Sequence, residues 1–504
     1  MEQKNKKKIS TQTIIKLLLA VVLLGLSAFL LKGDVWTFWT WWLLAGVMGF
    51  AAMPVTGRLF WRFEDKGWIF SKVLAIAATG FLTWFLTAIR LIPFNALTCA
   101  AVTILCAVIC FFLLRKESKE KTECFPVDRI SLIYWEELLF FLAFLMWTYL
   151  AGFRPAAYGT EKFMDYGFME AMMRSTTLPA RDLWYSEGHI NYYYGGQYFA
   201  VFLTKLSHTK VELTYNLMRT FVAGLAFAMP FSLVYQMMSD RMKGLQKSEK
   251  VIKGLPFAAG FTAGTAVSIA GNMHYVIYAQ IIPLIEKLTG REVSSYWFPD
   301  ATRYIGYNPY REEDRTIHEF PCYSFVLGDL HAHVVNIMFV LLVIALLYVW
   351  LRGVRKKTVP VEISMKDGKF WKEQLLMPHL LVISVLLGMF QWTNFWDFVI
   401  YYVVTLGTVL FANIIRFQGK IKKIMVVTFA QMAEIYLLAY LVILPFTLQF
   451  DTMVDGIGIA KYHSYFYQLL VLWGLPTVLT ITFVISILWE KLRGMEHKSL
   501  YRLM

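Results

Sequence analysis

The feature that most constrains this chain is a series of long apolar runs that recur along almost its whole length. Each run holds about 18 to 22 residues, the length of helix that crosses a hydrocarbon core of about 30 Å. Because lipid offers the backbone no hydrogen-bond partners, such a run must be helical. The sequence therefore predicts an all-α integral membrane protein with about twelve transmembrane helices. The predicted spans are 14–31, 37–55, 73–90, 96–114, 132–151, 215–237, 255–272, 334–351, 376–394, 397–415, 424–444 and 468–489.

The composition is also typical of a membrane protein. Hydrophobic residues make up 58% of the 504 residues and charged residues 17%, whereas soluble domains hold roughly 45–50% and 25%. The net charge of +14 would suit nucleic acid, but in a membrane protein excess Lys and Arg are typical of cytoplasmic loops. We therefore expect no nucleic-acid partner.

The distribution of basic residues predicts the orientation. With the N-terminus in the cytoplasm, alternation assigns to the cytoplasm the basic segments RKESKEK (115–121), RGVRKK (352–357) and KIKK (420–423), as the positive-inside rule requires. No small-residue cleavage site precedes Lys32, so the first apolar run is expected to be retained. We predict a multi-pass protein of the cell membrane, with large extracytoplasmic loops at 152–214 and 273–333.

One apolar segment does not fit this scheme as a span. Residues 192–206 form a run of only about 15 residues, which suits an interfacial or re-entrant helix better than a crossing. Counting it as a span would also invert every later loop. We therefore expect it to lie on the membrane or to dip into it.

The first large loop combines charged side chains with aromatic ones. Carboxylates among aromatic rings at a membrane surface are typical of sites for sugars or polar headgroups, and a carboxylate can act as a general base. The alternative for the tyrosines is an interfacial aromatic belt. Asp165 is the candidate catalytic residue. The candidate substrate-binding residues in this loop are Glu161, Lys162, Arg174, His189, Tyr192, Tyr193 and Tyr194.

The second large loop ends in GDLHAH, just before a span. In an extended segment alternate residues point the same way, so Asp329, His331 and His333 would converge. A carboxylate with imidazoles suits a divalent cation such as Mn²⁺, Mg²⁺ or Zn²⁺, with Asp329 and His331 as ligands, and His333 is a further substrate-binding candidate. The alternative is that Asp329 caps the helix that follows.

Two isolated charges fall inside predicted spans. Arg219, near an outer helix end, could hold a lipid phosphate or could extend toward the membrane surface. Glu434 lies near the middle of its span, where an ionisable group is often functional; the alternative is an interhelical hydrogen bond.

Several motifs together resemble one family. They occur in order between about residues 57 and 489: FEDKGWIFSKVL, MDYGFMEAMMRS, INYYYGGQYF, EFPCYSFVLGDLHAH, WTNFWDF and LPFTLQF. They resemble the uncharacterised YYY-domain membrane protein family, which is named for its tyrosine triplet. Ala332 stands where that family usually has Pro. Its members are usually longer, so we expect a short member or a truncated C-terminus.

That family is in turn remotely similar to the GT-C glycosyltransferases, which use sugars linked to polyprenyl phosphate on the extracytoplasmic face. The resemblance implies a GT-C-like transmembrane core at 132–504, preceded by two added helical hairpins at 1–131. It matches Asp165 to the acidic residue of the first outer loop and Asp329 with His331 to the later acidic pair. It also suggests Arg219 for the lipid phosphate.

These observations favour an extracytoplasmic glycosyltransferase of hexosyltransferase type, with Asp165 and Asp329 as catalytic residues. A polyprenyl-phosphate-linked sugar would be the donor and the acceptor is unknown. Two alternatives remain open. One is a transporter or flippase for a lipid-linked or polar solute, using Glu434 and Arg219, although no repeated halves are evident. The other is a metal-dependent membrane hydrolase.

The predicted orientation can be tested by labelling single cysteines in intact cells. In a chain without its native cysteines, an impermeant maleimide should label Glu312→Cys and leave Lys356→Cys unlabelled until the cells are opened. The reverse pattern would overturn the topology and the side on which the site is predicted.

Overall fold

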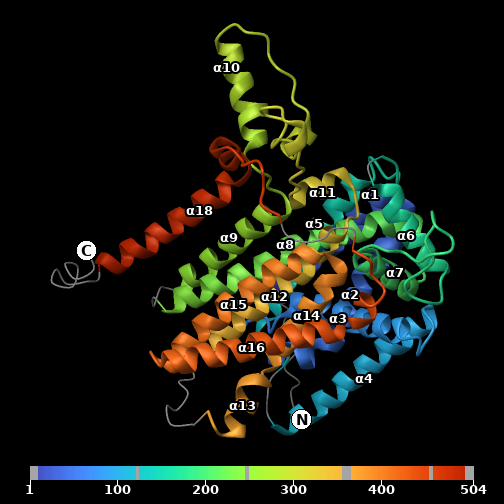
Figure 1. The fold of residues 1–504 in the computed structure, drawn as a ribbon, viewed down its shortest axis with the longest axis vertical. Coiled ribbons are helices and arrows are strands. Elements are labelled where there is room, and N and C mark those ends of the chain that lie inside the picture. The colour runs from blue at the N-terminus through green and yellow to red at the C-terminus, as the bar shows by residue number, and fades with distance from the viewer. Residues whose placement is uncertain are drawn as a thin grey trace, which may run out of the picture. The chain divides into compact units, whose positions relative to one another are not determined.

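The computed structural model is all-helical, with no β-strand among the residues that it describes (Figure 1). Those residues are 10–120, 124–159, 161–244, 249–354, 365–452 and 458–493. The helices are α1 (Thr11–Leu31), α2 (Val35–Leu59), α3 (Trp68–Ala88), α4 (Ala96–Glu120), α5 (Ile130–Ala151), α6 (Lys162–Arg174), α7 (Gly195–Ser207), α8 (Val211–Gly244), α9 (Glu249–Ser268), α10 (Ile282–Leu288), α11 (Pro321–Leu327), α12 (Ala332–Val354), α13 (Gly368–Leu375), α14 (Pro378–Thr393), α15 (Phe395–Phe417), α16 (Ile421–Val442), α17 (Leu444–Thr447) and α18 (Phe466–Arg493).

Each of the twelve predicted spans coincides with a helix. By length and composition, nine helical segments of the described chain can cross a membrane, or ten if the bent pair α13 and α14 is one span. Three predicted spans account for the difference from nine: α1 and α2 count as one segment, and α9 and α14 fall outside the count.

The first two helices nevertheless fold back on each other. The indole Nε1 of Trp39 donates to Ser27 Oγ at 3.0 Å. In one straight helix, residues twelve apart would be separated by about 18 Å. The chain must therefore reverse at the short 3-10 turn Lys32–Asp34, which makes α1 and α2 the predicted hairpin.

The chain divides into two compact units. The larger comprises residues 1–268 and 325–452, and the smaller comprises 269–324 and 453–504. The smaller unit has its own apolar core, in which Tyr304 and Ile305 pack with Val471 and Leu472 of α18. Most of the predicted loop 273–333 thus belongs to a separate unit, whereas its last residues belong to the larger one.

Within the larger unit, the N-terminal helices and the predicted GT-C-like core share one interior. Trp84 of α3 stacks on Trp392 of α14, with ring centroids 4.3 Å apart. The ammonium of Lys72, fully buried in α3, lies 2.7 Å from Glu137 Oε1 of α5. These contacts join residues 1–131 to residues 132–504. The boundary between 131 and 132 therefore does not separate two structural units, and the division into added hairpins and a GT-C-like core stays a prediction.

Segments predicted to share the cytoplasmic face lie together. Arg352 at the end of α12 pairs with Asp240 of α8 at 3.0 Å, and His379 Nε2 lies 2.8 Å from the Leu59 carbonyl oxygen. These contacts fit the predicted grouping of the loops. Some of the basic residues from which the orientation is predicted fall in segments outside the described residues, namely 1–9, 121 and 355–357.

The expectation that 192–206 lies on the membrane or dips into it stays a prediction, and the structure shows that protein covers the segment. Its helix, α7, is enclosed by the larger unit, and every residue from Gly195 to Lys205 is buried. Phe199 packs on Phe339 of α12, and the Tyr198 hydroxyl donates to the Gly80 carbonyl at 2.8 Å. Protein therefore covers this apolar segment, as a re-entrant helix allows and a helix lying on the membrane surface does not.

The Lys72–Glu137 pair gives a test of the joined interior. Lys72→Met should lower the free energy of unfolding of the detergent-solubilised protein by about 3–5 kcal/mol, because Glu137 would keep a largely buried, uncompensated charge. Thermal unfolding followed by tryptophan fluorescence would measure the loss. The exposed Lys210→Met is the control. The double variant Lys72→Met/Glu137→Gln should regain stability, because it no longer buries an unpaired charge. If it is no more stable than Lys72→Met, the ion pair does not account for the loss.

Candidate functional site

Asp165 lies in the first turn of α6 and is completely buried. Its Oδ1 accepts a hydrogen bond of 2.7 Å from Gln197 Nε2 of α7. The same nitrogen donates to the Leu330 carbonyl oxygen at 3.1 Å. One buried amide therefore ties the α6 carboxylate to the segment that carries Asp329 and His331.

The His331 imidazole lies between carboxylates from two segments. Its Nδ1 is 3.5 Å from Asp165 Oδ2 and 3.7 Å from Glu161 Oε2. Its Nε2 is 3.6 Å from Oδ2 of Asp329, which is nearly as buried as Asp165. The Glu161 side chain is 59% exposed and that of His331 16%, so solvent reaches the cluster from their side.

Two cationic groups meet beside this cluster at Gly328. A Cβ built on Gly328 would lie 3.2 Å from both the Arg219 guanidinium and Lys162 Nζ, and the backbone there has φ +94°. Glycine is therefore required both by the conformation and by the space. Burial lowers the pKa of the Lys162 ammonium, an effect that the Asp329 carboxylate opposes.

Arg219 is 2% exposed and is held by neighbours on both sides. It donates to the Phe325 carbonyl oxygen and, through NH2, to Asn216 Oδ1 at 2.7 Å. It therefore points into the protein rather than toward the membrane surface.

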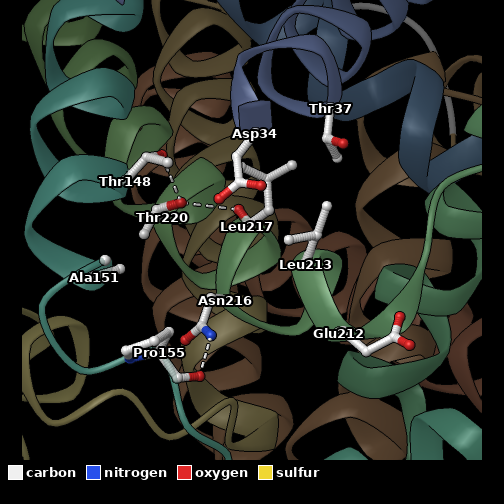
Figure 2. A pocket seen from close by; sticks show the side chains of 11 residues that line it. Asp34, Thr37, Thr148, Ala151, Pro155, Glu212, Leu213, Asn216, Leu217 and Thr220 are labelled. Atoms are coloured by element: carbon white, nitrogen blue, oxygen red, sulfur yellow. Dashed lines mark hydrogen bonds between the residues drawn. The ribbon is translucent and has the colours of Figure 1, made fainter. Parts of the chain in front are cut away.

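Behind Asn216 lies a small polar pocket of about 90 Å³, shown in Figure 2. Asn216 donates to the Pro155 carbonyl at 2.7 Å, and Thr148 and Thr220 share a hydrogen bond of 3.0 Å. At about 30 Å³ per molecule, the pocket has room for roughly three waters. Asp34, from the turn between α1 and α2, also lines it, so the N-terminal hairpin contributes to a pocket that includes Asn216, a partner of Arg219.

The tyrosine triplet divides among three environments. Tyr192 packs on Phe168 of α6, with ring centroids 5.7 Å apart, and burial, followed by the nearby Glu161 and Asp165 carboxylates, raises its pKa. Tyr193 packs on Phe450, with centroids 5.2 Å apart.

The third tyrosine is part of the interior. Tyr194 is 2% exposed, and its hydroxyl accepts a hydrogen bond of 3.0 Å from Trp84 Nε1. Its side chain is therefore part of the packing around Trp84.

Two other predicted binding residues lie away from the cluster. Arg174, at the far end of α6, pairs with Glu170 at 3.2 Å and is largely exposed. His189 is exposed and pairs through its backbone with Arg181 in an isolated β-bridge.

The alternation expected for Asp329, His331 and His333 holds only in part. Helix α12 begins at Ala332, so His333 is already helical, and its ring centroid lies 5.7 Å from that of His331. The residue before the helix is His331, and its carbonyl accepts from the Val334 N–H. Capping by Asp329, three residues before the helix, is therefore less favoured.

Gln197 and Gly328 are site residues that sequence reasoning missed. Gln197 is the polar residue inside the apolar run GGQYFAVF, which is the signal that could have identified it. Gly328 stands in GDLHAH, but its role depends on the packing of Arg219 and Lys162, which the sequence does not reveal.

Comparison with known proteins identifies a family and nothing finer. No curated protein and no solved structure matches the chain. The matching family model covers residues 78–504, which begins within α3 and takes in the whole of the cluster. This agrees with the expected multi-pass membrane family without a characterised activity. The chain therefore belongs to the family described as uncharacterized membrane protein (DUF2298).

Proposed function

We propose that this protein is an extracytoplasmic, GT-C-like glycosyltransferase that takes a sugar from a polyprenyl-phosphate donor. One observation carries the proposal: buried carboxylates from two separate segments, Asp165 and Asp329, face each other across His331, and two cationic side chains lie next to them. Burying several ionisable groups is costly even when they pair with one another, and clusters of this kind are concentrated at functional sites.

The reaction assigns a role to each sign of charge. Asp165 accepts the proton of the acceptor hydroxyl, whose oxygen attacks the anomeric carbon of the donor. The bond between that carbon and the phosphate oxygen breaks, and its electron pair leaves with the polyprenyl phosphate. Direct attack inverts the configuration at the anomeric carbon. Because Asp165 is fully buried, the acceptor would have to approach it from the exposed side, past Glu161 and His331.

Arg219 and Lys162 would stabilise the phosphate as it leaves. Their nitrogens converge near Gly328. Cations held in a partly dry site favour the developing negative charge more strongly than they would in water. Tyr192 and Glu161, at the accessible side, are positioned to contact the sugar.

A divalent cation would bind Asp329 and His331. Donor atoms of one ion usually lie about 3.0–3.4 Å apart, and the observed 3.6 Å needs only a small side-chain adjustment. No group of three or more His, Cys, Asp or Glu in the described part has the geometry of a metal site. Water or phosphate oxygens would therefore supply the other ligands. Such an ion would add positive charge beside the phosphate.

The proposed role of Asp165 as the general base can be tested by substitution. Asp165→Asn should lower the release of polyprenyl phosphate by about 100-fold or more, because an amide accepts no proton. The fold should survive, since the Asn oxygen still accepts from Gln197. Purified protein in liposomes would be assayed by mass spectrometry with polyprenyl-phosphate glucose, mannose and arabinose.

The matched control is Glu170→Gln, the same change on the same helix away from the cluster. Normal turnover by the Asp165→Asn variant would remove Asp165 as the base. Movement of intact donor across the bilayer by the wild-type protein, without release of polyprenyl phosphate, would favour the flippase.

The cation makes a separate prediction. Purified protein should retain a divalent metal, and His331→Gln should lose it while the exposed control His189→Gln keeps it. Binding should weaken at acid pH, because imidazole must be neutral to act as a ligand. Elemental analysis and activity after chelation would be measured. Full activity in protein that contains no metal would exclude this role.

A further inference from the structure

Helices α2, α3, α4 and α14 enclose a cavity of about 510 Å³ that the glycosyltransferase reaction does not account for. Its lining is almost entirely hydrocarbon. The two hydroxyls in the lining are already used: Thr79 donates to the Ala75 carbonyl at 2.7 Å, and Thr103 donates to the Cys99 carbonyl at 2.8 Å. A cavity of this kind does not hold water and takes apolar ligands.

The cavity exists because short side chains face it. Six alanines line it, contributed by α2, α3 and α4: Ala51, Ala52, Ala75, Ala77, Ala78 and Ala107. Protein interiors are normally close-packed, with few voids larger than a water molecule. Its volume falls within the range of about 300–1,000 Å³ that ligand sites occupy.

The cavity is continuous with the surface that faces lipid. Val47 and Ile104 line it and are 67% and 62% exposed, on helices apolar enough to cross the membrane. On α14 its lining extends from Leu381 to Met389, eight residues or about 12 Å of helix. A long, narrow, apolar space that opens to lipid suits a hydrocarbon chain.

One end of the cavity approaches the carboxylate cluster. Phe81 lines the cavity, and its ring centroid lies 5.5 Å from that of Trp84 and 6.4 Å from that of Trp392. Trp392 in turn packs so closely on Gly195 that a Cβ there would lie 2.9 Å from it. Gly195 begins the helix whose Gln197 holds Asp165. A single aromatic layer thus separates the cavity from the helix that supports the site.

We propose that this cavity binds part of the polyprenyl chain of the donor. The inference rests on the proposed function, which holds the lipid phosphate beside Arg219 and Lys162. The chain of that lipid must enter the hydrocarbon region from the same face. The cavity would then give a role to α2 and α4, which the family resemblance describes only as added helices.

Photo-cross-linking tests this binding site. A polyprenyl phosphate with a diazirine near its far end is added to the full-length protein in liposomes, and labelled peptides are mapped by mass spectrometry. Label should appear on α4 or α14 and fall about tenfold in Ala107→Phe, which fills the cavity. Ala101→Phe, on the same helix but outside the lining and exposed, should leave it unchanged.

A second measurement needs no variant. Cys106 and Cys110 line the cavity, so unlabelled polyprenyl phosphate should slow their alkylation by a lipophilic maleimide. Equal labelling by a diazirine phospholipid, or no protection of the cysteines, would overturn the inference and leave the cavity to bilayer lipid.

The two proposals fail differently. Saturable labelling on helices other than α4 and α14 would overturn the cavity alone. No saturable labelling on any helix would contradict the polyprenyl-phosphate donor as well. Labelling should persist in Asp165→Asn, because Asp165 does not contact the polyprenyl chain. Loss of turnover in that variant therefore tests the base and not the binding of the lipid.

Discussion

Buried charge in the larger unit is held between segments that are distant in sequence, and the arrangement of the helices depends on these contacts. Lys72 of α3 lies against Glu137 of α5, and Asp165 of α6 lies against His331. A charge left alone in such an interior would cost several kcal/mol, so each contact restricts how the segments can pack. The same restriction that stabilises the bundle thereby assembles the candidate site.

Much of this fold could be predicted from hydropathy alone. Each predicted span coincides with a helix, because lipid leaves a long apolar run no other conformation. The contact between Asp329 and His331 could also be predicted, since both precede α12 in non-helical backbone. The position of His333 could not be predicted, because the exact start of α12 decides whether the alternation continues, and helix ends are poorly determined by sequence.

The interior could not be predicted, because an apolar run does not reveal whether lipid or protein will cover it. Helix α7 was expected at the membrane and lies inside the unit. Tyr194 was expected to bind substrate and is part of the packing around Trp84. Gln197 was overlooked for the same reason: its amide is valuable only because Asp165 and Leu330, which are far away in sequence, meet it there.

Our preference for a catalytic function over transport rests on how the cluster is held. A single Gln197 nitrogen joins α6, α7 and the segment before α12, so relative movement of any of the three would leave buried polar groups unpaired, at about 1–3 kcal/mol each. Alternating access requires such movement around the bound solute. Catalysis instead gains from reacting groups held in fixed positions. We propose that a polar cluster held in this way, with an apolar cavity on the other side of α7, suits an amphiphilic substrate whose headgroup reacts while its chain stays in the membrane.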